Sequence, residues 1–190
     1  MAFATFRLNR NFRLRFYATS QSLRALAATL SYQPSKTKTM NIIIRKAEEK
    51  DSEKIWTLMK ELAVFEKYID SFAITPEIVK ESGFRKNPPD FHCIVADDND
   101  KIAGMLVYYF LPYTAQNRPA IYMKELYVDE NYRGQKIGEQ LMNALKIEAK
   151  QNNCNQIKWT VAPWNKAGQK FYERLGATEN NEWLNYEWKI

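Results

Sequence analysis

The sequence has few of the residues that could hold a fold together covalently or through a metal ion. Its 190 residues include two cysteines, Cys93 and Cys154, and a single histidine, His92. Two cysteines cannot build a disulfide framework, so we interpret both as small buried side chains of a protein in a reducing compartment. The spacing of these three residues matches no metal site. We therefore expect no metal, and expect His92 to pack or to form a hydrogen bond.

Long apolar runs are also missing. No stretch approaches the roughly 18 apolar residues that would suggest a membrane span, so no membrane partner is expected. Hydrophobic residues make up 45% of the chain and charged residues 26%, which is ordinary for a globular domain. This length suits one domain with an appendage.

Acidic residues are absent from positions 1–39, which carry seven Arg and Lys side chains. The whole chain carries +6, so residues 40–190 carry −1 once this +7 is subtracted. A nearly neutral domain lacks a basic face, and no nucleic-acid partner is expected. The extension has the acid-free, Arg- and Ser-rich composition that is typical of an organelle transit peptide. Alternatively, Met40 is the true start of the protein, or the extension is a membrane- or partner-binding arm.

Each of these interpretations leaves residues 1–39 outside the fold, as a basic and disordered extension. The expected location is the cytoplasm, or the mitochondrial or plastid matrix if the extension is a transit peptide.

Residues 40–190 have the pattern of an α+β domain. Expected strands cover 41–45, 91–96, 102–110, 121–128, 157–161 and 183–190. Expected helices cover about 52–68, 76–83, 138–151 and 166–175. Gly83 and Gly176 are placed to end the second and the fourth helix. The order predicts a mainly antiparallel half, followed by strand, loop, helix, strand, helix and strand.

The segment 122–149 reads as a strand, a short basic loop with glycines, and the start of a helix. This order gathers free backbone N–H groups and the positive end of a helix at one point, where a pyrophosphate can bind. Arg133 and Lys136 add positive charge, and Gly134 and Gly138 let the backbone approach the phosphates. The chain lacks the P-loop and three-glycine dinucleotide patterns, so an ordinary surface turn is the alternative.

A second motif follows downstream: Ala162-Pro163-Trp164-Asn165, then a helix that carries Phe171-Tyr172 and ends at Arg174-Leu175-Gly176-Ala177. Together with segment 122–149 it resembles the GNAT acetyltransferase superfamily. Further residues are similar to the spermidine/spermine and thialysine N-acetyltransferase branch, over a match that runs from about Ile42 to the C-terminus. They are Lys60-Glu61-Leu62-Ala63, Phe91–Ala96 and Tyr108-Tyr109-Phe110.

The resemblance implies the GNAT fold, a mixed and mainly antiparallel sheet that is splayed in the middle and flanked by about four helices. It also implies acetyl-CoA as co-substrate and a homodimer. The implied cofactor-binding residues are Leu126, Tyr127, Val128, Arg133, Gly134, Gln135, Lys136, Ile137, Gly138, Glu139, Asn165, Lys166, Gly168 and Tyr172. Lys136 stands where the family usually has a glycine. Asn165 suits both a cofactor contact and a helix N-cap.

The implied reaction is attack of a neutral primary amine of a small molecule on the thioester, through a tetrahedral intermediate. The amine would belong to a diamine, a polyamine or a thialysine-like compound. By resemblance Tyr172 is the acid for the departing thiolate, with a packing role as the alternative. The branch pairs two acidic residues in the splayed strand, but Lys124 replaces the first. Glu125 is therefore the candidate that receives the amine's proton.

The substrate-side residues implied by the resemblance are Phe65, Glu66, Lys124, Glu125 and Glu182. For Glu66, Glu125 and Glu182 the plain alternative is a solvated surface charge. Two other functions stay open: acetylation of a protein lysine or N-terminus, and a non-catalytic acetyl-CoA sensor. Tyr172 favours an enzyme, whereas Lys124 leaves the sensor open.

Overall fold

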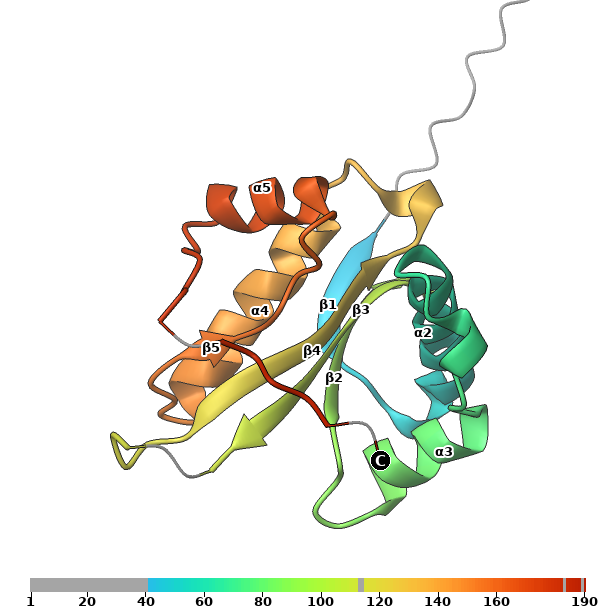
Figure 1. Cartoon of the computed structure of the whole chain (residues 1–190). Coiled ribbons are helices and arrows are strands. Elements are labelled where there is room, and N and C mark those ends of the chain that lie inside the picture. Colours follow the sequence, from blue (N-terminus) through green and yellow to red (C-terminus); the bar gives the residue numbers. More distant parts are fainter. Residues whose placement is uncertain (1–40, 113–114, 183, 189) are drawn as a thin grey trace, which may run out of the picture. The chain divides into compact units, whose positions relative to one another are not determined.

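The computed structural model describes residues 41–112, 115–182, 184–188 and 190 (Figure 1). The basic extension, with the three interpretations given for it, lies outside these residues.

Within the described ranges, five strands form one sheet in the order β1-β2-β3-β4-β5 (Figure 1). They are β1 (Ile42–Lys46), β2 (His92–Asp98), β3 (Lys101–Leu111), β4 (Ala120–Val128) and β5 (Ile157–Lys158). The first four strands are antiparallel neighbours, and β5 joins β4 in parallel. Asn99 and Asp100, both with positive φ, form the two-residue turn between β2 and β3. Such a turn matches the twist of its strands, and the antiparallel pairing expected for this half of the domain is confirmed.

Four α-helices flank the sheet within the described residues. They are α2 (Ser52–Phe65), α3 (Pro76–Lys80), α4 (Ile137–Gln151) and α5 (Lys166–Arg174). Thr75 caps α3 by accepting a hydrogen bond from the Ile78 amide at 3.2 Å. The mixed sheet and its helices confirm the predicted fold class.

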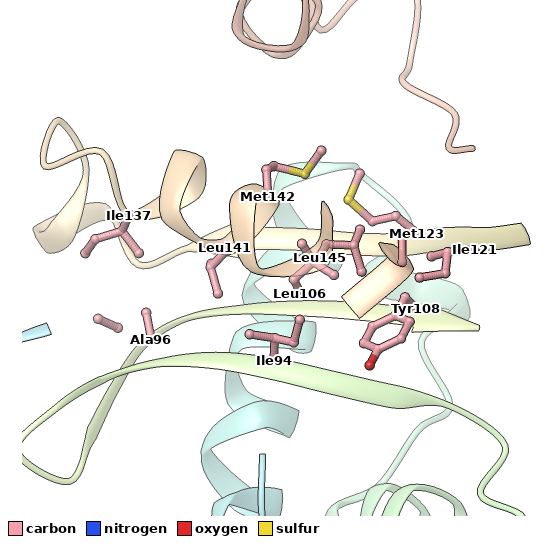
Figure 2. Packing of buried hydrophobic residues seen from close by; sticks show 12 residues of the cluster. Ile94, Ala96, Leu106, Tyr108, Ile121, Met123, Ile137, Leu141, Met142 and Leu145 are labelled. Carbon is pink, nitrogen blue, oxygen red and sulfur yellow. The ribbon is translucent and has the colours of Figure 1, made fainter. Parts of the chain in front are cut away.

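Both faces of the sheet are buried because alternate residues of β3 enter different cores. Leu106 and Tyr108 pack with Leu141 and Leu145 of α4 (Figure 2). Met105 and Val107 instead pack in the core that contains Ile55 and Leu62 of α2. Side chains alternate across a strand, so the burial of both faces explains why β3 is almost continuously apolar. Truncating Leu106 or Leu141 to alanine would cost about 2 to 5 kcal/mol of the unfolding free energy.

The prediction that Gly83 ends the second helix is wrong. The chain continues from α3 into a π-helical turn, Glu81–Arg85, and Gly83 lies in the middle of that turn. A Cβ at this position would lie 2.7 Å from the tip of the Phe91 ring. Packing against Phe91 therefore explains the glycine, and helix termination does not.

The predicted strand over 183–190 is also wrong for the residues that the structure describes. Residues 184–188 and 190 are not in a strand, and the side chains of Leu184, Tyr186 and Trp188 are 80%, 87% and 92% exposed. A strand needs a hydrogen-bonded neighbour, and alternating side chains alone do not provide one. For the same reason β5 ends at Lys158, three residues before its expected end, where its pairing with β4 stops.

Candidate active site

The site begins with a β-bulge in the middle of β4. In the β3–β4 ladder Val107 pairs with Glu125 while Tyr108 pairs with Met123, so Lys124 is an extra residue on β4. An extra residue in one strand shifts the alternation of the side chains that follow it.

The bulge brings two charged side chains onto the same face of the sheet. Before it, Met123 belongs to the core beneath α4; after it, Leu126 packs against that core. Tyr127 packs instead against the core on the α2 side. Since neighbouring residues alternate, both Lys124 and Glu125 lie on the α2 face of β4. A regular strand would have placed them on opposite faces.

Beside the bulge, β4 and β5 separate. The two strands pair only at Ile121 with Ile157 and at Tyr122 with Lys158. A cavity of about 800 Å³ lies along the later part of β4. Its walls come from the end of α2, from β4 after Tyr122, from the loop and first turn of α4, and from α5 with the segment from Thr160 that precedes it. This volume is within the usual range for a small-molecule or cofactor site.

Most of the expected cofactor residues meet around this cavity. Those that line it are Leu126, Tyr127, Val128, Arg133, Gly134, Lys136, Ile137, Gly138, Glu139, Asn165, Gly168 and Tyr172. Gln135 and Lys166 are not among the lining residues. Sequence reasoning missed Leu62, Met123, Tyr132, Thr160, Val161, Ala167, Phe171 and Arg174. The available signal was their position in the sequence, since each of them lies within five residues of an expected residue.

The loop before α4 and the first turn of α4 line the cavity. Gly134 and Lys136 both have positive φ, at 79° and 61°, and α4 begins directly afterwards at Ile137. The first N–H groups of a helix have no carbonyl partner within it, and they form its positive end. A non-glycine residue in the left-handed region costs roughly 1 to 2 kcal/mol, so Lys136 holds this conformation at a cost that glycine would avoid.

Arg133 connects three walls of the cavity. Its Nε donates to the Val128 carbonyl at 3.1 Å. Its guanidinium carbon lies 5.4 Å from the centre of the Tyr127 ring and 6.0 Å from that of Phe65 at the end of α2. The positive charge is therefore held at the edge of the cavity by one hydrogen bond and two aromatic rings.

Asn165 caps α5. Its Oδ1 accepts a hydrogen bond from the Gly168 amide at 2.9 Å, which satisfies one of the unpaired N–H groups of the helix start. A Cβ on residue 168 would lie 2.7 Å from the Asn165 Nδ2 atom, so Gly168 leaves room for the cap. The N-cap interpretation of Asn165 is confirmed by this bond.

Glu125 is the most perturbed carboxyl group of the cavity. Its Oε2 atom is buried and has no hydrogen-bond partner among the residues that the structure describes. Burial raises the pKa of Glu125 to about 7; the nearby Lys124 charge lowers it, and Glu66 raises it further. A carboxyl group with this pKa is poised to accept a proton at neutral pH.

Tyr172 lies on the α5 side of the same cavity. Its ring packs against Trp159 and Phe171, with centroid distances of 5.0 and 5.2 Å. Burial raises the pKa of Tyr172 to about 12, and the negative charge of Glu66 adds to the effect. The phenol therefore keeps its proton at neutral pH, as a proton donor must.

The expected substrate residues divide into two groups. Phe65, Glu66, Lys124 and Glu125 line the cavity. Glu182 does not: it lies in an exposed stretch after α5, where its amide donates to Asn180 Oδ1. The ring of Phe65 packs against Trp164, 5.8 Å between centroids, and so links the end of α2 to the loop before α5.

His92 lies outside this cavity, and its ring contacts those of Tyr108 and Phe110, with centroid distances of 5.3 and 5.1 Å. Burial lowers its pKa, which is the behaviour of a packed imidazole. Within the described ranges no group of three or more His, Cys, Asp or Glu side chains could hold a metal ion. None of the helices in the described part of the chain has the length and apolarity needed to cross a membrane.

Comparisons with known proteins match this arrangement. The family model "Acetyltransferase (GNAT) family" matches residues 53–177. A thialysine N-epsilon-acetyltransferase of Sus scrofa is 32% identical over 160 residues, which cover 78% of this chain and 93% of that protein.

Solved structures of other proteins have the same fold as this chain. An integron cassette protein from the mobile metagenome of V. cholerae superposes with a TM-score of 0.69 at 25% identity, over 80% of this chain and 94% of that one. An aminoglycoside N-acetyltransferase in complex with CoA superposes with a TM-score of 0.63 at 14% identity, over 81% and 99%. The matched residues include the bulged strand β4, the loop that precedes α4, and helix α5. The chain therefore belongs to the GNAT family of acetyltransferases.

Proposed function

We propose that this N-acetyltransferase moves an acetyl group from acetyl-CoA to a primary amine of a small molecule, by direct attack through a tetrahedral intermediate. One observation carries the proposal: three groups that this reaction needs line a single cavity. They are the carboxyl group of Glu125, whose pKa is raised to about 7, the protonated phenol of Tyr172, and the N-terminus of α4, which suits a phosphate.

The residues present fit acetyl-CoA along the cavity. The loop and first turn of α4 offer N–H groups to a pyrophosphate, and Arg133 and Lys136 add two positive charges there. Beyond Tyr122, no strand in the described part of the chain pairs with β4 on the β5 side. The backbone groups of Leu126, Tyr127 and Val128 can therefore bind the amide groups of the pantetheine arm and polarise the acetyl carbonyl.

The proposed reaction needs two proton transfers that these residues can make. Glu125 takes a proton from the substrate ammonium, and the neutral nitrogen attacks the thioester carbon. The C–N bond forms, and the C–S bond then breaks as Tyr172 gives its proton to the departing sulfur. The nitrogen loses its second proton in this collapse, and that proton restores the phenol. The proton on Glu125 returns to solvent.

Negative charge on the wall formed by α2 and β4 supports a small amine as the acceptor. Glu66 and Glu125 line it, and an ammonium group is stabilised beside carboxylates. The similarity to a thialysine N-epsilon-acetyltransferase also supports a small amine as the acceptor. Protein lysines or N-termini, and a sensor without turnover, are the alternatives.

A competition experiment tests this choice of acceptor. The protein would be incubated with acetyl-CoA and an equimolar mixture of small diamines, diamino acids and short peptides with free lysine or N-terminal amines. Mass spectrometry should find acetylation mainly on a small amine. Acetylation confined to peptides would favour the protein acetyltransferase, and binding of acetyl-CoA without any acetylated product would favour the sensor.

We also propose that the protein is a homodimer. Leu184, Tyr186 and Trp188 are strongly exposed apolar side chains on alternate positions, and a second copy of the chain could cover them. Sedimentation of the full chain and of a variant with serine at all three positions tests this. A dimer that becomes a monomer in the variant supports the proposal, and a monomeric parent overturns it. The cytoplasmic or matrix location stays a prediction, which mass spectrometry of the mature N-terminus and cell fractionation can test.

A further inference from the structure

Phe65 is an aromatic residue of the cavity for which the proposed reaction has no use. It is the last residue of α2, it lines the cavity, and its side chain is 43% exposed. Its ring contacts Arg133 of the loop before α4 and Trp164 of the loop before α5, at 6.0 and 5.8 Å. A contact with the arginine of the loop before α4 points to a role on the cofactor side of the cavity.

We propose that Phe65 is a positioning residue of the cofactor site, which together with Tyr127 holds the guanidinium group of Arg133 ready for the pyrophosphate of acetyl-CoA. This inference rests on the proposed function, because acetyl-CoA is the ligand of the same cavity. It also gives Phe65 a different role from the one that the family resemblance implies, which places this residue on the substrate side.

The contacts of Arg133 provide the geometric basis. Its side chain is exposed, yet its Nε donates to the Val128 carbonyl at 3.1 Å. Its guanidinium carbon lies 5.4 Å from the centre of the Tyr127 ring and 6.0 Å from that of Phe65. Both distances are within the roughly 6 Å over which a cation is attracted to an aromatic ring. Since Tyr127 belongs to β4 and Phe65 to α2, the guanidinium group is restrained from two walls of the cavity.

The terminal nitrogens of this guanidinium group are available to a ligand. In the part of the chain that the structure describes, they donate to no protein group, and Arg133 forms no ion pair within 4 Å. By contrast, Arg45 and Arg85 pair with Asp51 and Glu49 at 2.7 and 2.8 Å. A restrained cation without a carboxylate partner, beside the N-terminus of α4, complements a pyrophosphate.

Phe65 is itself supported by Trp164. The two rings are tilted by 58° at a centroid distance of 5.8 Å, within the range of favourable aromatic pairs. The Lys67 ammonium group lies 5.6 Å from the centre of the Trp164 ring. Contacts therefore run from Tyr127 through Arg133 and Phe65 to Trp164. They join β4, the loop before α4, the end of α2 and the loop before α5.

Restraining Arg133 before the ligand arrives lowers the cost of binding. A mobile surface side chain loses rotamer freedom when it binds a ligand, and this loss weakens binding by roughly 2- to 10-fold in Kd for each long side chain. A side chain that is already restrained loses less freedom. Removal of the Phe65 ring should therefore weaken the binding of CoA by a factor in this range, but only while Arg133 is present.

A double-mutant cycle tests this dependence. Calorimetry would measure the Kd of CoA for the parent, for Phe65→Leu, for Arg133→Met and for the double variant. Phe65→Tyr is the conservative variant, because it keeps an aromatic ring at this position. Val64→Ala is the matched control, because Val64 is an exposed apolar residue of the same helix that does not line the cavity. The KM values for acetyl-CoA and for an amine would be measured in the parent and in Phe65→Leu.

Phe65→Leu should weaken the binding of CoA by about 3- to 10-fold when Arg133 is present, and by less than about twofold in the Arg133→Met background. Phe65→Tyr and Val64→Ala should bind CoA like the parent. In Phe65→Leu the KM for acetyl-CoA should rise and the KM for the amine should stay the same.

Three results would each overturn the inference. They are an equal effect of Phe65→Leu on the Kd of CoA in both backgrounds, including no effect in either, a Phe65→Tyr variant that binds as weakly as Phe65→Leu, and a rise in the KM for the amine alone. The last result would return Phe65 to the substrate side of the cavity.

A failure of the proposed function would look different. If the parent binds CoA but acetylates no amine, the proposed function fails, and the binding cycle decides the inference on its own. If the parent does not bind CoA at all, both the proposed function and the inference fail.

Discussion

The phenol of Tyr132 donates a hydrogen bond to the buried carboxylate of Asp98, 3.0 Å from Oη to Oδ2. Asp98 ends β2 and is only 1% exposed, and its Oδ1 also accepts from the Asn41 amide at 3.2 Å. Tyr132 immediately precedes Arg133 and lines the cavity. The bond therefore fastens the loop before α4 to the β2–β3 hairpin.

Tyr132→Phe should loosen this loop without touching the amine site. A hydrogen bond to a charged, buried carboxylate contributes about 1.5 to 3 kcal/mol, so we expect a loss of that order in the unfolding free energy, measured by urea denaturation. The KM for acetyl-CoA should rise, and the KM for the amine should stay the same. A rise in the KM for the amine alone would contradict this role.

Lys136→Gly should stabilise the protein. Lys136 has a φ of 61°, and glycine avoids the cost of roughly 1 to 2 kcal/mol that this conformation has for other residues. Lys136→Ala is the matched control, since alanine also removes the ammonium group but still has to adopt the unfavourable positive φ. Thermal or urea unfolding should show that the glycine variant is more stable than the alanine variant. Both should bind CoA more weakly than the parent at low salt, and equal stability of the two would refute the strain argument.

The pH dependence of the reaction should follow Glu125. Its pKa of about 7 predicts that kcat/KM rises with pH below 7 and levels off above it, because only the carboxylate accepts a proton. Glu125→Gln should lower the plateau by about 100-fold or more and remove this inflection. Glu130→Gln, on an exposed carboxyl outside the cavity lining, serves as the control. An unchanged inflection in Glu125→Gln would assign it to another group.

The carboxyl group of Glu125 should also make the protein less stable at higher pH. The folded-state pKa of Glu125 lies above the ordinary value of 4.5, so the folded protein binds more protons than the unfolded chain between these values. Stability therefore falls as pH rises from about 4.5 to 7. Since one pKa unit corresponds to about 1.4 kcal/mol, the rise from 4.5 to about 7 corresponds to about 3.5 kcal/mol. Glu125→Gln should therefore gain on the order of 3 kcal/mol of unfolding free energy at pH 8 relative to the parent.

Much of this architecture can be predicted from the sequence, because local signals agree with it. The apolar runs of β2 and β3, the turn residues between them and the periodic apolar face of α4 each predict the element that forms. The failures have physical causes. Residues 184–188 alternate like a strand but pair with no strand among the residues that the structure describes. Gly83 is required by the ring of Phe91 and not by a helix end.

The site, too, could be predicted from the sequence only where local sequence signals exist. Residues of the loop before α4 and of α5 are recognisable by type and spacing, and they do meet at the cavity. The bulge at Lys124 is a property of the β3–β4 register, which no local pattern shows. The pKa of Glu125 depends on burial between α2 and β4, so it too required the structure.

Tyr172→Phe should separate chemistry from binding. The phenol would protonate the departing sulfur, and loss of a general acid typically costs about 10²- to 10⁴-fold in rate. The ring packing against Trp159 and Phe171 would remain. We therefore expect kcat to fall by about that factor while the affinity for CoA, measured by calorimetry, changes little. Tyr122→Phe is the control, because Tyr122 lies on β4 outside the cavity lining. An unchanged kcat would remove Tyr172 from the mechanism.

Release of free thiol from acetyl-CoA, followed with and without an amine, tests the central claim most directly. The purified protein should release thiol in proportion to the acetylated amine formed, at a rate that saturates with both substrates, and only slowly when the amine is left out. Thiol release that is independent of every amine offered, or saturable binding of acetyl-CoA with no release at all, would contradict the assignment of this cavity to acetyl transfer.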